Sequence, residues 1–441
     1  MNAYRNLRQY YEYRNRMLLE GAFGGRLDVV KTAFEAGADV NGDEAIPPIA
    51  AATLADHAGI VEFLLEKGAD PDKPVTAEVP CPGVLGTSTM LGERTLHLAA
   101  RSRNVELVRL LLERSGADIN ATDNKGRTPL MITCETSLAC VEVVRLLLDA
   151  GADAALAQED GYTPMHAVAE NGHMHLVDMV CSKAPATLSH FAAAGQTPLL
   201  WACVRGHEGM VSKLLSLGAR QRVPPHEGDR CPLNTAVLEG SVGVVRILTT
   251  DEGIRALGDK MLIVPGATYL AVRFQARALR LLLRVDGEER RSWWANHAHS
   301  SGSSLLHVGA GYCCPAGVSV LLEAGADEAL RDAEGRTPRD AIGIYRGVDG
   351  LPEMNRGEEV AVRRMLQRGP AYRARSWAWP SDEEARAGGG GGAAAADDDD
   401  ALSSPPVLKT AHDIGVRIFR PKEKTSSKFF ARVVGRYCAK G

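Results

Sequence analysis

Three stretches near the middle of the chain share one pattern: Gly126-Arg127-Thr128-Pro129-Leu130, Gly161-Tyr162-Thr163-Pro164-Met165-His166 and Gly195-Gln196-Thr197-Pro198-Leu199. A fourth copy is Gly335-Arg336-Thr337-Pro338. In each copy a threonine precedes a proline. Threonine can cap a helix, and proline is favoured in the first helical turn because its missing N–H is not needed there. The pattern therefore predicts four helix starts.

Weaker copies of the pattern extend the series in both directions. The residues at the proline position are 48, 95, 129, 164, 198, 232, 269, 305 and 338, and the steps between them are 47, 34, 35, 34, 34, 37, 36 and 33. A period of this kind is typical of a repeat array, in which each unit buries its apolar face against its neighbours.

The second half of each unit has its own signature. Residues 108–112 read Val-Arg-Leu-Leu-Leu and are followed by Gly116-Ala117-Asp118; residues 144–148 read the same and are followed by Gly151-Ala152-Asp153. Such a run predicts a second helix that ends at the glycine, which accepts a positive φ. We expect Leu110 and Leu146 to be buried between units, so that replacement by alanine costs about 2–5 kcal/mol.

Together these motifs resemble the ankyrin repeat, which has a period of 33 residues and a T-P-L-H-x-A signature. The resemblance covers roughly residues 16 to 380. It implies an all-α ankyrin-repeat solenoid of about ten helix-turn-helix repeats with β-hairpin fingers and no central sheet. It also implies a protein that binds other proteins.

Departures from the period suggest a domain plan. We expect an N-terminal extension (1–16), the array (17–380), an acidic low-complexity linker (381–410) and a basic tail (411–441), the last two forming a disordered C-terminal tail. Within the array, 73–91 is an irregular insertion, 251–292 a degenerate repeat and 358–380 a cap. Residues 287–303 are predicted to form a long finger.

Composition narrows the function classes. The 441 residues carry a net charge of −4, which predicts no overall attraction to nucleic acid. Neither a signal peptide nor an apolar run long enough for a membrane span is visible, so we expect an intracellular protein, cytoplasmic or nuclear. The nine cysteines form no CxxC, and we expect no metal site and no cofactor.

No phosphate-binding, hydrolase or metalloprotease motif is present, so the sequence predicts no enzyme, although a subunit of an enzyme stays open as an alternative. His97, His166 and His307 recur at one repeat position, and His173 and His207 at another. Because these histidines recur with the period, we interpret them as residues that hold turns.

The resemblance places recognition on finger tips and inner helices, which line a concave face in ankyrin-like arrays. At a finger tip, Arg127 is expected to matter little for stability, while Trp201 is expected in the core. Trp293 and Trp294 are open between packing and contact. The candidate partner-binding residues are Lys125, Arg127, Tyr162, Glu170, Asn171, Gln196, Arg205, Arg230, Trp293 and Trp294.

The basic tail suggests a second contact. On a helix over residues 426–437 the apolar and basic side chains would lie on opposite sides, which is typical of a segment that docks on an anionic membrane. The alternative is a plain basic linker. The chain is therefore predicted to be a scaffold or adaptor for a protein partner, or else a membrane-proximal adaptor. The candidate docking residues are Lys428, Phe429, Phe430, Arg432, Val433 and Arg436.

Overall fold

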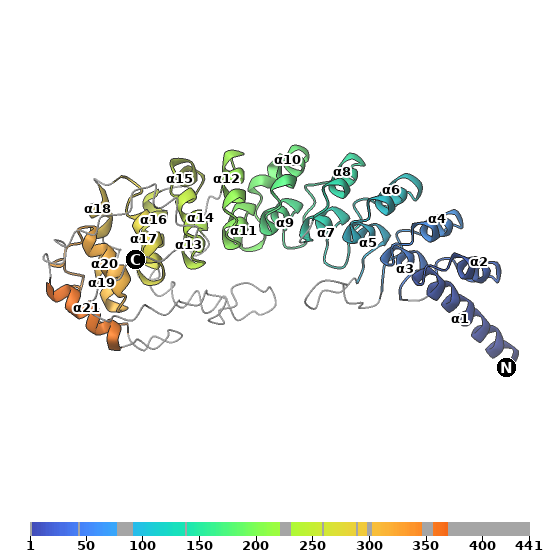
Figure 1. Cartoon of the computed structure of the whole chain (residues 1–441), viewed down its shortest axis with the longest axis horizontal. Coiled ribbons are helices and arrows are strands. Elements are labelled where there is room, and N and C mark those ends of the chain that lie inside the picture. The colour runs from blue at the N-terminus through green and yellow to red at the C-terminus, as the bar shows by residue number, and fades with distance from the viewer. Residues whose placement is uncertain are drawn as a thin grey trace, which may run out of the picture. The chain divides into compact units, whose positions relative to one another are not determined.

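The computed structural model describes residues 2–42, 45–76, 91–136, 139–220, 231–257, 260–287, 290–297, 302–345 and 356–368. They belong to two compact units, Met1–Gln221 (unit 1) and Arg222–Gly441 (unit 2). Within the described residues, all regular structure is helical. The predicted all-α class is thereby confirmed. Figure 1 shows the chain of helices.

Unit 1 stacks pairs of antiparallel helices. The first helices α3, α5, α7, α9 and α11 form one row in which each contacts the next, and the second helices α4, α6, α8, α10 and α12 form another row alongside (Figure 1). The bounds are α1 Asn2–Phe23, α2 Leu27–Glu35, α3 Pro48–Leu54, α4 Ala58–Glu66, α5 Thr95–Ser102, α6 Val105–Arg114, α7 Pro129–Glu135, α8 Val141–Asp149, α9 Pro164–Asn171, α10 Met174–Lys183, η1 Pro185–Ser189, η2 Ala193–Gly195, α11 Pro198–Val204 and α12 Glu208–Ser216.

Unit 2 repeats this plan with changes. Its first helices α13, α16 and α19 contact one another in order, as do its second helices α14, α17 and α20, and α21 packs on α20. The bounds are α13 Pro232–Leu238, α14 Val242–Leu248, α15 Asp251–Leu257, α16 Lys260–Phe274, α17 Ala276–Leu282, α18 Arg291–Asn296, α19 Leu305–Gly311, α20 Pro315–Glu323 and α21 Arg356–Arg368.

Three of the four helix starts predicted from the motif are confirmed, and the one at Pro338 is wrong, because residues 338–345 form turns. α7, α9 and α11 each begin at the proline, and the preceding threonine is the N-cap. The hydroxyl of Thr128 accepts a hydrogen bond from the N–H of Met131 at 3.3 Å. At the other end of a pair, Gly151 has φ +98°, a value that a residue with a β-carbon rarely adopts.

The fingers between pairs are tight turns. Two backbone bonds close a turn of this kind, for example from the N–H of Asp123 to the carbonyl of Arg127 (3.0 Å) and from the N–H of Gly126 to the carbonyl of Asp123 (2.9 Å). Ala192 and Gln196 form an isolated bridge, and the described residues contain no β-strand. The predicted β-hairpin fingers are therefore reduced to turns in the described residues.

Asparagine side chains join neighbouring fingers. The amide oxygen of Asn120 accepts a hydrogen bond from the N–H of Asp153 at 2.9 Å, and that of Asn41 accepts one from Asp70 at 2.7 Å. Each bond connects two fingers that are about one repeat apart in the sequence, so the turns have fixed positions relative to each other within unit 1.

Helices α15 and α18 occupy places where the sequence suggested irregular chain. Within 251–292, α15 precedes α16, and α17 supplies the expected second helix. The prediction of a long finger over 287–303 is wrong in its described part, because Arg291–Asn296 forms α18. The buried Trp294 explains this helix, since its indole packs inward and donates a hydrogen bond to Asp286 at 3.0 Å.

The remaining domain predictions meet the structure only in part. The boundary expected after residue 16 falls inside α1, whose Leu18 and Ala22 are buried. Residues 77–90 of the insertion and all residues after Arg368, including the linker, the tail and the end of the cap, lie outside the described residues.

Candidate partner-binding surface

Three histidines of the repeated motif each link one repeat to the next repeat. The Nδ1 atom of His97 accepts the backbone N–H of Arg94 at 3.2 Å, so the proton is on Nε2, which donates to the carbonyl of Arg127 at 3.0 Å. His166 and His307 make the equivalent bonds, their Nε2 atoms reaching the carbonyls of Gln196 (3.2 Å) and Arg336 (2.9 Å). The histidines hold turns, as we predicted.

The rings of His97 and His166 are buried in their neutral form. Burial lowers the pKa of His97 to about 4, and the hydrogen bond to Arg127 opposes this only in part. Burial likewise lowers the pKa of His166 to about 4. Because both ring nitrogens are engaged with the backbone, neither histidine is free to exchange protons with a substrate.

Histidines at a second position of the motif also connect neighbouring repeats. His173 bonds through Nε2 to the carbonyl of Thr136 at 2.8 Å, and His207 bonds to the carbonyl of Glu170 at 3.0 Å. Burial lowers the pKa of His173. These links fix the ends of the first helices α7 and α9, where several candidate binding residues lie.

The prediction that Arg127 lies at an exposed finger tip, on which its expected small effect on stability rested, is wrong. Its side chain is buried and pairs with Asp123 (2.7 Å), Glu93 (3.2 Å) and Glu135 (3.2 Å). Glu93 is buried as well and also pairs with Arg101. The turn that closes at residue 127 directs its side chain inward, against three carboxylates of which only two are close in sequence.

The charged groups of this network shift one another's pKa values. Burial alone would lower the pKa of the Arg127 guanidinium, but Glu135, Asp123 and Glu93 together raise it above its ordinary value. Burial raises the pKa of Glu135, and the charge of Arg127 opposes that shift. The side chain of Glu135 keeps some solvent access and also accepts a hydrogen bond from Gln158 at 3.3 Å.

Next to this network lies a group of aromatic and charged side chains. The Tyr162 hydroxyl donates to Glu170 at 2.6 Å, and Glu170 pairs with Arg205, the residue that directly follows the next first helix, α11. The ring of Tyr162 contacts Trp201 edge to face, with centroids 6.0 Å apart. Burial and the Glu170 carboxylate raise the pKa of Tyr162, which stays a neutral donor.

We call Glu135, Tyr162, Glu170, Trp201 and Arg205 the inner row. Tyr162 is buried, Glu135, Glu170 and Trp201 are partly exposed, and Arg205 is exposed. The row runs along α7, α9 and α11 and brings together three of the predicted residues, Tyr162, Glu170 and Arg205. Trp201 was predicted in the core but lies partly at the surface.

The other predicted residues are dispersed. Lys125 is exposed at its turn, and its N–H bonds to Asp123. Asn171 bonds to the carbonyl of Ala167, and the carbonyl of Gln196 accepts from His166. Trp293 is exposed whereas Trp294 is buried. Arg230 and the tail residues Lys428, Phe429, Phe430, Arg432, Val433 and Arg436 lie outside the described residues.

Sequence reasoning missed two surface residues. Glu135 occupies the repeat position of Glu170, so the periodicity itself could have indicated it. Phe191 is 47% exposed in a turn whose backbone approaches Gly161 of the preceding turn. It follows no motif, so only the structure shows that an aromatic ring stands at a finger tip.

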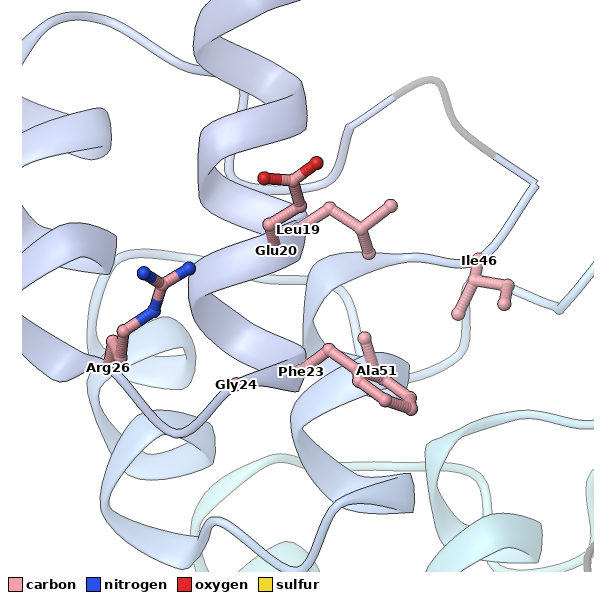
Figure 2. Close-up of a pocket in the computed structure, with 7 residues that line it drawn as sticks. All are labelled: Leu19, Glu20, Phe23, Gly24, Arg26, Ile46 and Ala51. Carbon is pink, nitrogen blue, oxygen red and sulfur yellow. The ribbon is translucent and has the colours of Figure 1, made fainter.

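An open apolar hollow of about 470 Å³ lies at the N-terminal end of unit 1. Figure 2 shows Leu19, Phe23, Ile46 and Ala51 around it, with Glu20 and Arg26 as the charged members of its lining. The described residues of its lining include no cysteine, serine or histidine.

The described part of the chain lacks two kinds of feature. No helix there has the length and apolarity required to cross a membrane. No group of three or more His, Cys, Asp or Glu side chains there has a metal-binding arrangement.

Comparison with known proteins gives a family match. The family model for ankyrin repeats (3 copies) matches residues 77–158, 96–189 and 138–225. The chain is 27% identical over 248 residues to the ankyrin repeat protein nuc-2 of Neurospora crassa, a match that covers 54% of this chain and 22% of the relative.

Two human proteins are also similar. The ankyrin repeat and SOCS box protein 16 is 30% identical over 212 residues (46% of this chain, 42% of the relative), and the SMC5-SMC6 complex localization factor protein 1 is 34% identical over 126 residues (27% and 12%). The chain spans less than half the length of each relative. The repeated motif, the paired helices and these matches agree: residues 77–225 of the chain are ankyrin repeats.

Proposed function

We propose that the chain is an interaction scaffold whose inner row binds a protein partner. Ankyrin repeats generally mediate protein–protein interactions, and the inner row is the surface in unit 1 that fits this role. The observation that carries the proposal is the continuity of Glu135, Tyr162, Glu170, Trp201 and Arg205 over three successive first helices.

The chemistry of the inner row suits an interface. Tyrosine, tryptophan and arginine are the residue types enriched among the side chains that contribute most to binding. Hydrogen bonds already hold Tyr162 and Glu170 in place, so little side-chain entropy is lost when a partner arrives. The carboxylates and Arg205 supply both charge signs, which favours a partner surface of mixed charge.

The same geometry disfavours catalysis by this surface. Tyr162 is neutral, the neighbouring His166 and His207 are bonded to backbone carbonyls, and Glu135 and Glu170 are paired with arginines, so none of these groups is an activated nucleophile or a base without a partner. We therefore propose binding without turnover. One relative is named a localization factor of the SMC5-SMC6 complex, and such a role is consistent with scaffolding.

The test is affinity purification with the full chain, comparing wild type with Arg205→Glu. We expect at least one captured protein to lose most of its signal in the variant, because charge reversal repels groups that pair with Arg205 and breaks its pair with Glu170. Arg145→Glu is the matched control, because Arg145 is equally exposed but lies on the second helix α8.

The two variants distinguish the outcomes. Loss of the same proteins from both would indicate a general charge effect, and loss of none from Arg205→Glu would place the interface elsewhere. Circular dichroism of both variants checks that the array remains folded.

A further inference from the structure

A second surface with its own chemistry lies in unit 2. At the end of α16 the guanidinium carbon of Arg273 is 4.5 Å from the ring centroid of Phe274 and 4.6 Å from that of Tyr312. Tyr312 stacks on Tyr345, with centroids 4.5 Å apart and planes inclined by 27°. We call Arg273, Phe274, Tyr312 and Tyr345 the arginine stack.

Arg273 has no anionic partner within the described residues. Arg127 and Arg336 pair with carboxylates, but Arg273 has no ion pair or hydrogen bond there and contacts only the two rings. The titratable groups that face it are the Tyr312 hydroxyl and the Cys314 thiol. Burial raises the pKa of that thiol to about 12, so it is neutral, and burial lowers the pKa of Arg273.

The position of Arg273 favours binding of an anionic hydrogen-bond acceptor. The rings hold the guanidinium plane in position, and all five N–H donors lack a protein acceptor in the described structure. Leaving donors of a partly buried charged group unpaired is unfavourable, so an incoming anion gains more here than at a fully solvated arginine. A carboxylate matches the guanidinium in charge and in its planar, two-oxygen geometry.

Exposed apolar side chains belong to the arginine stack or adjoin it in sequence, so a ligand should also have an apolar part. Phe274 is 43% exposed and Ile344, next to Tyr345 in the sequence, is 41% exposed. The stack therefore presents one positive charge with apolar surface beside it. A phosphate dianion would leave one negative charge uncompensated against this apolar surface, which favours a carboxylate.

We propose that the arginine stack docks a partner segment in which an aspartate or glutamate stands next to an aromatic or aliphatic residue. The carboxylate pairs with Arg273, and the neighbouring side chain covers Phe274 and Ile344. The proposal is independent of the inner row, because the arginine stack belongs to unit 2 and the inner row to unit 1.

The experiment measures fluorescence anisotropy of a fluorescein-labelled peptide of alternating phenylalanine and glutamate, titrated with the full chain. We expect saturable binding, and about tenfold weaker binding when every glutamate is replaced by glutamine, since a charge-assisted pair is lost. Arg273→Gln should weaken binding of the acidic peptide by a similar factor. Arg273→Lys, which keeps the charge but not the planar fork, should give an intermediate loss.

A matched control is available on the next helix. Arg277 is an exposed arginine of α17, so Arg277→Gln makes the same change in net charge and should leave binding unchanged. Glu170→Gln in the inner row should also have no effect on this peptide. Failure of the inner row as an interface is thus distinguishable from failure of the arginine stack.

Three results would overturn the proposal. The first is equal binding of the acidic peptide to wild type and Arg273→Gln. The second is tighter binding of a peptide with phosphoserine in place of glutamate, which would assign the stack to phosphorylated segments. The third is binding that appears only after Asp382, Glu383 and Glu384 are replaced by their amides, which would show that the chain's own carboxylates occupy the stack.

Discussion

At the scale of single residues, Arg127 shows how a surface-type residue becomes part of an ankyrin core. Its guanidinium lies within ion-pair distance of Glu93, Asp123 and Glu135, and the first two carboxylates have no exposed side-chain surface. Removing one member of a buried charge network leaves its partners without compensation, which costs more than the network contributes as a whole. Arg127 therefore has a structural role that its position between glycine and threonine does not indicate.

Arg127→Ala is expected to lower the free energy of unfolding by about 3–5 kcal/mol, because Asp123 loses its ion-pair partner while it stays buried. The measurement is urea unfolding followed by circular dichroism. Lys125→Ala, two residues earlier at the exposed end of the same turn, should change the free energy by less than about 0.5 kcal/mol. Equal effects of the two substitutions would contradict the burial of Arg127.

At the scale of helices, the leucine runs of the second helices do not reveal which leucine faces the core. In α6 the three consecutive leucines cover more than one face, and Leu111 is fully buried whereas Leu110 is partly exposed. α8 repeats this with Leu147 buried and Leu146 partly exposed. Our choice of Leu110 and Leu146 as buried leucines was thus wrong by one position. The buried set Leu107, Val108 and Leu111 has the spacing of one helix face.

Leu111→Ala is expected to destabilise the chain by about 2–5 kcal/mol, because it opens a cavity between α6 and its neighbours. Leu110→Ala should cost clearly less, since solvent already reaches that side chain. Thermal and urea unfolding of the two variants gives a direct comparison in one helix. A cost for Leu110→Ala as large as that for Leu111→Ala would show that the faces are assigned incorrectly.

At the scale of the whole molecule, the period of the sequence predicts much of the fold, and tertiary contacts decide the rest. Pro129, Pro164 and Pro198 begin helices where the motif places them, because capping is a local property. The inward direction of Arg127 depends on Glu93, which is 34 residues away, and helix α18 depends on the burial of Trp294. Neither contact leaves a signal in one sequence. The assignment of the inner row to a partner stays a proposal.

His97 and His166, which join adjacent repeats, make the stability of unit 1 depend on pH. In the unfolded chain a histidine titrates near 6.5, whereas His97 and His166 in the folded chain resist protonation until about pH 4. The unfolded state therefore binds more protons between these values. Stability is full above pH 6.5, falls as the pH drops towards 4, and loses roughly 3 kcal/mol per histidine over that window.

The measurement is the urea midpoint between pH 7.5 and pH 4. His97→Gln and His166→Gln should each be less stable at neutral pH and show a weaker decline in acid, because glutamine does not titrate. His175→Gln is the control, since His175 is exposed on α10. If stability declines just as steeply in acid in a variant that carries both His97→Gln and His166→Gln, the acid sensitivity belongs to the carboxylates.

The bonds from His97 to the Arg127 carbonyl and from His166 to the Gln196 carbonyl have a mechanical consequence. Each joins only two adjacent repeats, so a pulling force applied at the ends of unit 1 would load these joints in series. The weakest joint would open first and release its repeat while the others hold. Each event would lengthen the chain by roughly 34 residues at about 3.5 Å apiece, or about 120 Å, so that the array would act as an extensible tether with a fixed step.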